Sequence, residues 1–456
     1  MYSILALTLG TACGETPRPT PRGAVLILVD TLRPDRLGCY GHERPTSPAI
    51  DSLAETGVLF EHVVSSAPWT MPSVGALLSA NEPELAFDTD WKLLSSVVED
   101  FSEAGIKTAA FTEGAFVSRH FGMDLGFETF VEEESSFHAT MAGERLNSEA
   151  PLTGGIGNTF NLARQWLEQN SEAPFFLVIH TYEVHTPYTR PRFAKGDGGR
   201  IGKSFDIRML KPMQTGEIEL TDQERAHVID LYDGGIRATD RHVGRFLEFL
   251  NELGLRDKVV VALTSDHGEE LGEHSERFAF DHGHSLKDNL LLVPLIINDP
   301  TRSWPVHVVT DQVRTLDVLP TIADLLGVPA RGDTNGSSLV PLMNGHDSGA
   351  RFAVSGQTQA GPHRMSLRDG NFKYIVSIAE GDQPLEDDIA DEQLYDLRAD
   401  PAEQHNLASD HEAVTSSMAR WLRRWKKGVA RPTRRATPKA MDKAHLERLK
   451  ALGYLK

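Results

Sequence analysis

Residues 24–29 read AVLILV, an uninterrupted apolar run that ends at Asp30. A strand with one solvated face alternates apolar and polar residues, whereas a strand covered on both faces is apolar throughout. This run therefore predicts a central strand of a parallel sheet with helices on both sides. The segment TSPAIDSLAETG, which starts at Thr46, predicts the next helix, with Ser47 as its N-cap and Pro48 at its first position.

Strands and helices continue to alternate along the chain. The predicted strands are 107–112, 174–180 and one that ends at Ser265, and the predicted helices are 90–104, 159–169 and 221–253. Such units build an α/β fold, in which a large, mostly parallel sheet is sandwiched by helices. Ligands bind at the carboxyl edge of sheets of this kind.

The pattern changes after Gly332. Segments 352–357 (FAVSGQ), 365–378 and 392–400 predict short antiparallel strands in a smaller C-terminal subdomain. The predicted organisation is a signal and tether over 1–22, a large domain over 23–332, the subdomain over 333–415 and a basic helical tail over 416–456.

The composition excludes some partners. The 456 residues include 46 Lys and Arg against 65 Asp and Glu, so the formal net charge is −19. This charge argues against a nucleic-acid partner and against binding to an anionic membrane surface. The cations of the tail are therefore interpreted as a solvated helix face. The two cysteines, Cys13 and Cys39, specify no disulfide framework.

The first residues, MYSILALTLGTAC, resemble a bacterial lipoprotein signal that ends at a lipidated Cys13. The Pro-rich segment up to Arg22 would then be a membrane tether. We expect an exported protein, periplasmic or anchored as a lipoprotein. The alternative is a frayed N-terminus on a cytoplasmic protein. No later segment reaches the roughly 18 to 20 uninterrupted apolar residues of a membrane span.

Polar residues follow the predicted strands. Asp30, His185, Asp266 and His267 each come after a strand end. Taken singly, the carboxylates could cap turns and the histidine could be an ordinary loop residue. Taken together, they converge on one edge of the sheet, as the ligands of a divalent metal do in α/β enzymes.

Residues 67–79 read APWTMPSVGALLS and leave two interpretations open. Thr70 or Ser73 could cap a helix, because a hydroxyl satisfies a free backbone N–H there. Alternatively, Thr70 is a nucleophile at a helix start, where free N–H groups favour an incoming anion. The nearby metal ligands favour the second interpretation, because a metal activates a hydroxyl that is inert in water.

Several motifs in a fixed order resemble the sulfatase family of the alkaline phosphatase superfamily. They are LILVDTLRPDRLGCYG, APWTMPSVGALLS, HTYEVHTPY, TSDHGEELGEH, HGHSLKDNLLLVPLII and LYDLRADPAEQHNL. The resemblance covers about residues 24–407 and implies an alkaline phosphatase-like fold. It also implies one divalent cation (Ca, Mn or Mg) held by Asp30, Asp266 and His267, with Thr70 as nucleophile and fourth ligand.

The resemblance implies further roles on an anionic ester substrate. His185 would contact the charged oxygens, and His284 matches a basic position near the leaving group. Lys287 is close enough in sequence to assist, although a surface lysine explains it equally well.

The chain also departs from the family pattern. Familiar sulfatases carry Cys or Ser, converted to formylglycine, where Thr70 stands, and Arg where Val74 stands. Thr31 occupies the place of a second Asp. A threonine nucleophile is similar to the phosphodiesterase and phosphoglycerol-transferase branches, which makes phosphoester chemistry at least as expected as sulfate chemistry.

The predicted function is a metal-dependent hydrolase or transferase of sulfate or phosphate esters that acts through Thr70. The alternatives are a catalytically inactive relative that binds an anionic ligand, and a metal-stabilised structural protein. The sequence does not specify the oligomeric state.

Overall fold

The computed structural model describes residues 20–133, 155–196, 198–329, 331–346, 349, 351–378 and 392–428. The expected lipid anchor at Cys13, most of the tether and the tail beyond residue 428 lie outside the described residues. Within the described part, no helix combines the length and the apolar character that a membrane crossing requires.

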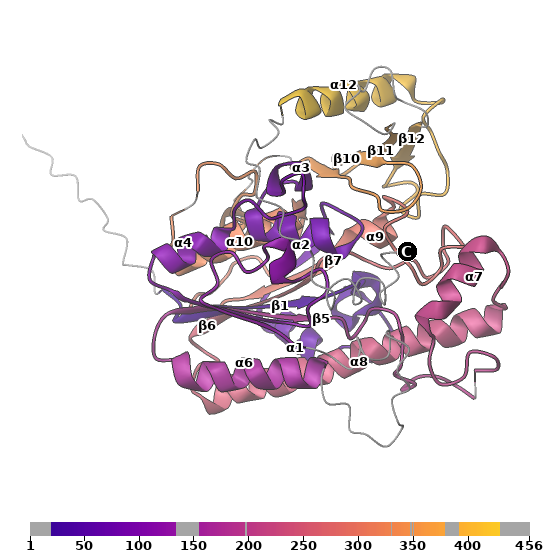
Figure 1. Cartoon of the computed structure of the whole chain (residues 1–456). Helices are drawn as coiled ribbons and strands as arrows, with labels where there is room; N and C mark the ends of the chain where they lie inside the picture. The colour runs from indigo at the N-terminus through magenta and orange to yellow at the C-terminus, as the bar shows by residue number, and fades with distance from the viewer. Residues whose placement is uncertain are drawn as a thin grey trace, which may run out of the picture.

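An eight-stranded sheet forms the centre of the larger domain (Figure 1). Its strands lie in the spatial order β4-β3-β5-β1-β6-β7-β2-β8. They are β1 (Gly23–Val29), β2 (Val58–Val64), β3 (Lys107–Thr112), β4 (Thr129–Glu132), β5 (Phe175–Thr181), β6 (Val259–Ser265), β7 (Leu292–Asn298) and β8 (Val308–Arg314). β7 is antiparallel to both neighbours, and the other pairs are parallel. The predicted mostly parallel sheet is confirmed.

The burial of β1 explains its uninterrupted apolar sequence. Its even-numbered side chains from Ala24 to Leu28 pack into one core, and its odd-numbered side chains from Val25 to Val29 pack into the other. The first core is covered by α2 (Thr70–Ser79), α4 (Val97–Glu103) and α10 (Val318–Leu326), and the second by α1 (Pro48–Thr56), α6 (Ile156–Asn170) and α8 (Asp222–Glu252) (Figure 1). Each face of the strand thus needs apolar residues.

Short elements complete the larger domain. The short helices are α3 (Pro83–Ala86), α7 (Leu210–Thr215), α9 (Asp288–Leu291) and α11 (Val340–Met343), and the 3₁₀ turns are Pro34–Arg36, Gly38–Tyr40, Arg119–Phe121, Ile207–Met209 and Thr315–Asp317.

The helix predicted over 90–104 is wrong in its first half, because α4 begins only at Val97. The carboxylate of Asp88 accepts the backbone N–H groups of Asp90 and Lys92, both at 2.9 Å, and holds this segment in a turn. Ser96 then caps α4. An Asp side chain that bonds the backbone ahead of it competes with a helical start.

By contrast, the predicted helix over 221–253 matches α8 within one residue at each end. Thr221 is its N-cap: the Thr221 hydroxyl accepts the N–H of Glu224 at 3.2 Å, and the Glu224 carboxylate accepts the N–H of Thr221 at 2.9 Å. This reciprocal pair is a capping box, which the sequence pattern T-x-x-E encodes locally.

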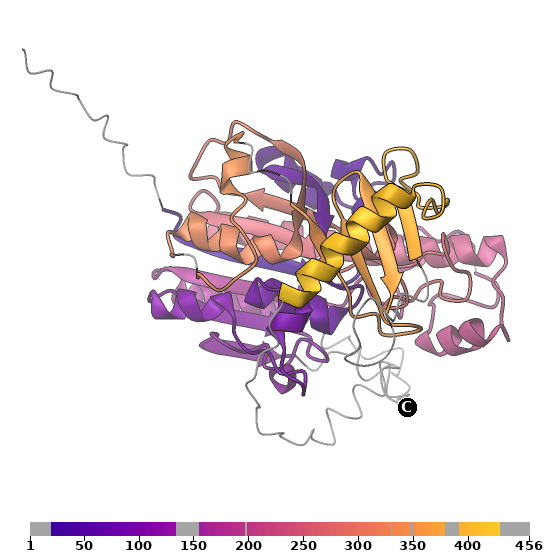
Figure 2. The same cartoon turned by 90° about the horizontal axis from the view of Figure 1, so that it is seen from above.

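A four-stranded antiparallel sheet forms the C-terminal part, as predicted. Its order is β12-β11-β10-β9, and its strands are β9 (Ala353–Ser355), β10 (Arg364–Arg368), β11 (Phe372–Ser377) and β12 (Glu392–Asp396). Helix α12 (Glu412–Gly428) lies across this sheet (Figure 2). It buries Met418 and Leu422 against Leu367 and Leu394.

A buried ion-pair cluster joins the small sheet to the larger domain. Lys373 on β11 is fully buried, and its ammonium lies 2.7 Å from Asp288 Oδ1 and 3.1 Å from Glu403 Oε1. Arg368 on β10 adds a second cation, 3.3 Å from Asp288 Oδ2. Because Asp288 begins α9, this cluster connects the antiparallel sheet to the segment just before β7.

Candidate active site

Three neighbouring strands end together at one edge of the sheet. Val29 at the end of β1 pairs in register with Thr181 of β5 and Ser265 of β6. The next residues on β1 and β6 are Asp30 and Asp266, so the parallel register itself places the two carboxylates side by side. Parallel strands present their carboxyl ends on the same edge, where ligands bind in α/β sheets.

Asp30, Asp266 and His267 form a compact group of metal-ligand type. One ligand atom from each lies within 4.8 Å of the others, and all three side chains are buried. His267 Nε2 lies 3.5 Å from Asp266 Oδ2 and 3.8 Å from Asp30 Oδ1. His267 Nδ1 lies 2.8 Å from the carbonyl oxygen of Gly268. A bond of this kind orients the ring so that the other nitrogen faces a metal.

The donor atoms of this group fit a divalent cation. Asp30 Oδ1 and Asp266 Oδ2 are buried and have no hydrogen-bond partner among the described residues. Burial first, and then the charge of Asp266, raises the pKa of Asp30 well above its usual value. Two buried carboxylates with unpaired oxygens are costly unless a cation compensates them. Asp30, Asp266 and His267 could therefore hold one.

Thr70 is the first residue of α2 and joins the same group. Its hydroxyl donates to Asp30 Oδ2 at 3.0 Å and lies 3.4 Å from His267 Nε2. The capping interpretation is wrong: Trp69 holds the N-cap position, and the Ser73 hydroxyl donates to the Trp69 carbonyl oxygen at 2.8 Å. Neither hydroxyl accepts a backbone N–H at this helix start, so the Thr70 side chain points to the carboxylates instead.

The turn after β1 is strained and held from several sides. Thr31 has φ of +56°, a conformation that β-branched residues rarely adopt. Its N–H donates to Asp266 Oδ1 at 3.3 Å, and its carbonyl oxygen accepts the Tyr232 hydroxyl at 2.7 Å. A strained backbone conformation of this kind persists only where surrounding contacts hold it in place, and such positions are common at functional sites. Thr31 thus contributes its backbone, and not a carboxylate, to the group.

His185 lies in the loop after β5 and is buried. Its Nδ1 is 2.5 Å from the carbonyl oxygen of Thr186, and its ring centroid is 4.9 Å from that of His282. The His282 ring in turn lies 4.4 Å from the ring of His267. His185 is therefore connected to the metal-ligand group through His282.

His284 packs against the loop that follows β6. Its ring stacks on Phe278 at 4.6 Å, and its Nε2 lies 4.0 Å from Glu270 Oε2. The imidazole between His267 and His185 belongs to His282, two residues earlier. The pattern HGH at residues 282–284 indicates that a histidine lies here. Gly283 has φ of +78° and turns the chain between the two rings, so the sequence spacing alone does not show which ring faces the site.

Lys287 contacts the small sheet. Its ammonium donates to the Glu403 carbonyl oxygen at 2.6 Å and lies 3.6 Å from the ring centroid of Tyr395. These contacts place Lys287 at the junction with the C-terminal part, and they give no support to a role near the leaving group.

His180 is a member of the site that the sequence interpretation did not select. It is fully buried near the end of β5, and its Nε2 lies 3.9 Å from Asp30 Oδ2. Burial lowers the pKa of His180 to about 4. The available signal was a single imidazole in the otherwise apolar run PFFLVIH. It could not be assigned to the site before β5 was known to lie beside β1.

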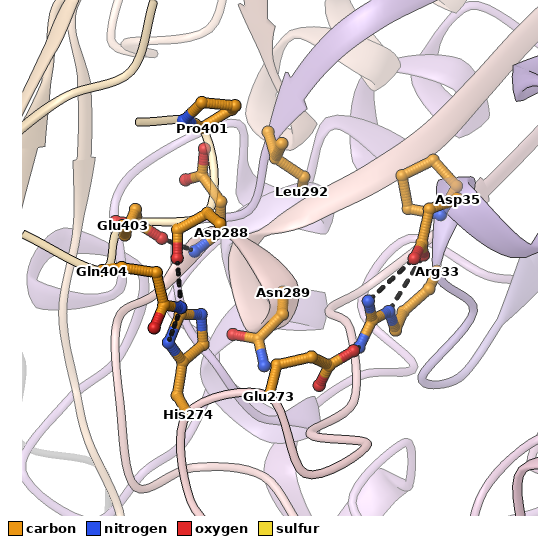
Figure 3. A pocket seen from close by; sticks show the side chains of 12 residues that line it. Arg33, Asp35, Glu273, His274, Asp288, Asn289, Leu292, Pro401, Glu403 and Gln404 are labelled. Carbon is orange, nitrogen blue, oxygen red and sulfur yellow. Dashed lines mark hydrogen bonds and ion pairs between the residues drawn. The ribbon is translucent and has the colours of Figure 1, made fainter. Parts of the chain in front are cut away.

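A cavity of about 260 Å³ lies between the larger domain and residues 401–404 of the C-terminal part (Figure 3). It is lined by Arg33, Pro34, Asp35, Glu273, His274, Asp288, Asn289, Leu292, Pro401, Ala402, Glu403 and Gln404. Arg33 pairs with Asp35 and Glu273 across its wall, and its Nη1 also donates to the Glu269 carbonyl oxygen at 2.9 Å. The loop after β6 therefore borders both this cavity and the metal-ligand group.

Removal of one carboxylate tests the metal site. We expect Asp266→Ala to bind no stoichiometric metal, because it loses one of the three ligands, whereas the wild type should carry close to one divalent ion per chain. Elemental analysis after purification without chelator measures this. Asp299→Asn, which changes a buried aspartate just after β7, is the matched control and should keep its ion. Two ions per wild-type chain would contradict a single site.

Family models and known proteins match most of this chain. The family model named sulfatase matches residues 23–328, and the model named N-sulphoglucosamine sulphohydrolase, C-terminal, matches residues 272–427. A choline-sulfatase of Rhizobium meliloti is 31% identical over 444 residues, which covers 85% of this chain and 82% of the relative. An arylsulfatase of Clostridium perfringens is 26% identical over 85% of this chain and 90% of the relative.

Among solved structures, the phosphonate monoester hydrolase of Agrobacterium radiobacter has a TM-score of 0.68. It is 20% identical and covers 89% of this chain and 95% of its own. At this identity the likeness concerns the fold.

Proposed function

The chain belongs to the sulfatase family, and on that premise we propose that it is a hydrolase of sulfate or phosphate esters that uses Thr70 as its nucleophile. The reaction class is supported by the names of its relatives, which are sulfatases and phosphonate monoester hydrolases. The observation that supports Thr70 is its position at the start of α2, with its hydroxyl 3.0 Å from Asp30 and 3.4 Å from His267.

The start of α2 suits an anionic group. The first N–H groups of a helix have no partner within the helix, and the helix dipole favours negative charge there. A divalent cation held by Asp30, Asp266, His267 and Thr70 would activate the hydroxyl and polarise the ester. The chain itself orients the hydroxyl through its hydrogen bond to Asp30. It also surrounds the hydroxyl with buried side chains that exclude water.

Two imidazoles near this group are suited to a charged ester. The rings of His185 and His282 are buried and lie next to each other beside His267. Each could donate a hydrogen bond from Nε2 to a sulfate or phosphate oxygen, where charge develops in the transition state, when its ring carries a second proton. The proposal assigns this oxygen-binding role to His185 and His282, and not to His284, whose ring stacks on Phe278.

If Thr70 is the nucleophile, a covalent intermediate forms on its side-chain oxygen during the reaction. After mixing with a slowly turned-over aryl phosphate or aryl sulfate and quenching in acid, we expect a phosphoryl or sulfuryl group on the peptide that contains Thr70. Tandem mass spectrometry locates the group, and accurate mass distinguishes the two esters. The comparison of the two substrates also shows which ester class the protein prefers.

Ser73 is the matched control in the same peptide, because its hydroxyl is already bonded to the Trp69 and Thr70 carbonyl oxygens. Ser73→Ala should still form the adduct. An adduct on Ser73, or turnover without any adduct on Thr70, would contradict the assignment. Binding of an aryl ester without turnover would support the alternative, an inactive relative that binds anions.

A further inference from the structure

Helix α12 carries a cluster of cations in its second half. The cluster consists of Arg420, Arg423, Arg424, Lys426 and Lys427, whereas the only acidic residue of the helix is Glu412 at its start. Within the described part of the chain, the first four of these cations form no ion pair with a carboxylate.

Such unpaired cations stand out in an acidic protein. The chain has 65 Asp and Glu against 46 Lys and Arg, so carboxylates are not scarce. Exposed arginines elsewhere find one: Arg200 pairs with Glu224, and Arg208 pairs with Asp206. The helix dipole accounts for cations only in the last turn of a helix, and Arg420 lies before that turn.

The packing of α12 determines which of its side chains point outward. Met418 and Leu422 are buried against the small sheet, so the opposite side of the helix faces away from the protein. Arg420 and Arg424 lie one turn apart on that side, and both are exposed. In both views α12 is the outermost of the described elements over the small sheet (Figures 1 and 2). A broad surface can therefore touch these two arginines without moving another element.

Aromatic rings border the exposed arginines. Phe352, just before β9, is 37% exposed and is one of two large apolar side chains exposed among the described residues. Its ring centroid lies 4.8 Å from that of Trp421, which is half-buried and follows Arg420 directly. We call Arg420, Arg424, Trp421 and Phe352 the basic aromatic face. Cations beside aromatic rings are typical of protein surfaces that lie at a lipid interface.

We propose that the basic aromatic face docks on a lipid bilayer that contains anionic headgroups. The arginines would meet the headgroup phosphates, and the rings of Trp421 and Phe352 would enter the boundary between headgroups and acyl chains. This inference goes beyond the proposed function, because it concerns where the protein is held and does not involve Thr70.

The net charge of −19 does not prevent this contact. At physiological ionic strength salt screens surface charges over about 8 Å, so the potential at a surface that touches α12 is set by the cations of α12 itself. The proposal replaces the interpretation of these cations as a merely solvated helix face. One basic face binds a bilayer weakly, and stable attachment takes a second signal such as the lipid chain expected at Cys13.

A bilayer fits this face better than a nucleic acid does. A helix that reads DNA lies inside the major groove and is enclosed on several sides. The small sheet covers one side of α12 along Met418 and Leu422, so only the opposite side is free. A flat partner needs no more than that side, and it also accommodates exposed aromatic rings.

Co-sedimentation with vesicles tests the proposal. The full chain carrying Cys13→Ala is used, so that no lipid chain contributes. We expect it to bind equimolar phosphatidylcholine and phosphatidylglycerol vesicles, to bind pure phosphatidylcholine vesicles far less, and to be released by high salt. Adding Arg420→Glu and Arg424→Glu should weaken binding at least about 10-fold, because both charges at the contact are reversed. Phe352→Ser should weaken it about threefold.

Arg241→Glu combined with Arg245→Glu is the matched control. These arginines are also exposed and one turn apart, on α8, so the charge change is identical but lies away from the basic aromatic face. Binding should change by less than about twofold. Circular dichroism shows whether each variant is folded. If the glutamate pair on α12 unfolds the protein, Arg420→Gln combined with Arg424→Gln replaces it and should also lose most of the binding.

Each outcome decides the proposal. Binding that survives both α12 pairs, or that the α8 pair reduces equally, overturns the assignment to this face. Equal binding to pure phosphatidylcholine overturns the role of the charges. If a DNA duplex binds as tightly as the mixed vesicles and Phe352→Ser has no effect on either, the face is a general polyanion site and the bilayer is overturned. None of these results bears on turnover or on labelling of Thr70, so the proposed function stands or falls separately.

Discussion

Thr70→Ala is expected to lower turnover of aryl phosphates and sulfates by at least about 10³-fold, because it removes the group that bonds to the transferred phosphorus or sulfur. The folded state should lose only about 1 kcal/mol, the usual contribution of one hydrogen bond, because the hydroxyl makes no capping bond and its partner Asp30 keeps the other members of the group. Steady-state kinetics measures the first effect and thermal unfolding the second.

Thr70→Ser is the matched control for this prediction. Serine keeps a hydroxyl at the start of α2 and loses only a methyl group, so we expect measurable activity and an adduct on the new side chain. Turnover by Thr70→Ala at the wild-type rate would mean that water or another residue attacks the ester. Thr70 would then be a hydrogen-bond donor to Asp30 without a chemical role.

Lys373→Met is expected to destabilise the protein by about 3–5 kcal/mol, the usual cost of removing one partner from a buried ion pair. The lysine is fully buried, and its loss leaves Asp288 and Glu403 without the cation that lies between them at the junction of the two sheets. Urea unfolding followed by circular dichroism measures the difference in the free energy of unfolding.

Two variants control this prediction. Lys287→Met removes a half-buried lysine at the same junction and should cost less, because its ammonium bonds a carbonyl oxygen and not a buried carboxylate. The double variant Lys373→Met/Asp288→Asn should recover part of the lost stability, because Asp288→Asn removes a carboxylate charge that Lys373→Met leaves unpaired. A change of less than about 0.5 kcal/mol in Lys373→Met would show that the pair adds little to the junction.

The sequence alone determined the elements with strong local patterns. The strand over 107–112 has the bounds of β3, and the helix over 221–253 follows from its amphipathic repeat and the capping box at Thr221. The run AVLILV predicted a strand covered on both faces because two cores require apolar residues at every position. Asp30 and Asp266 with His267 followed from the same strands, since the carboxyl ends of parallel strands meet at one edge.

The tertiary structure decided what depends on segments distant in sequence. His180 lies near Asp30, 150 positions away in the sequence, only because β5 pairs with β1. Lys287 turns to Glu403 because the C-terminal part packs against the segment around α9. Between His282 and His284, the Glu269 carboxylate and the turn at Gly283 select the ring that faces the site. A local pattern reports burial and backbone preference, whereas the partner of a polar side chain is set by packing between elements, which no single stretch of sequence contains.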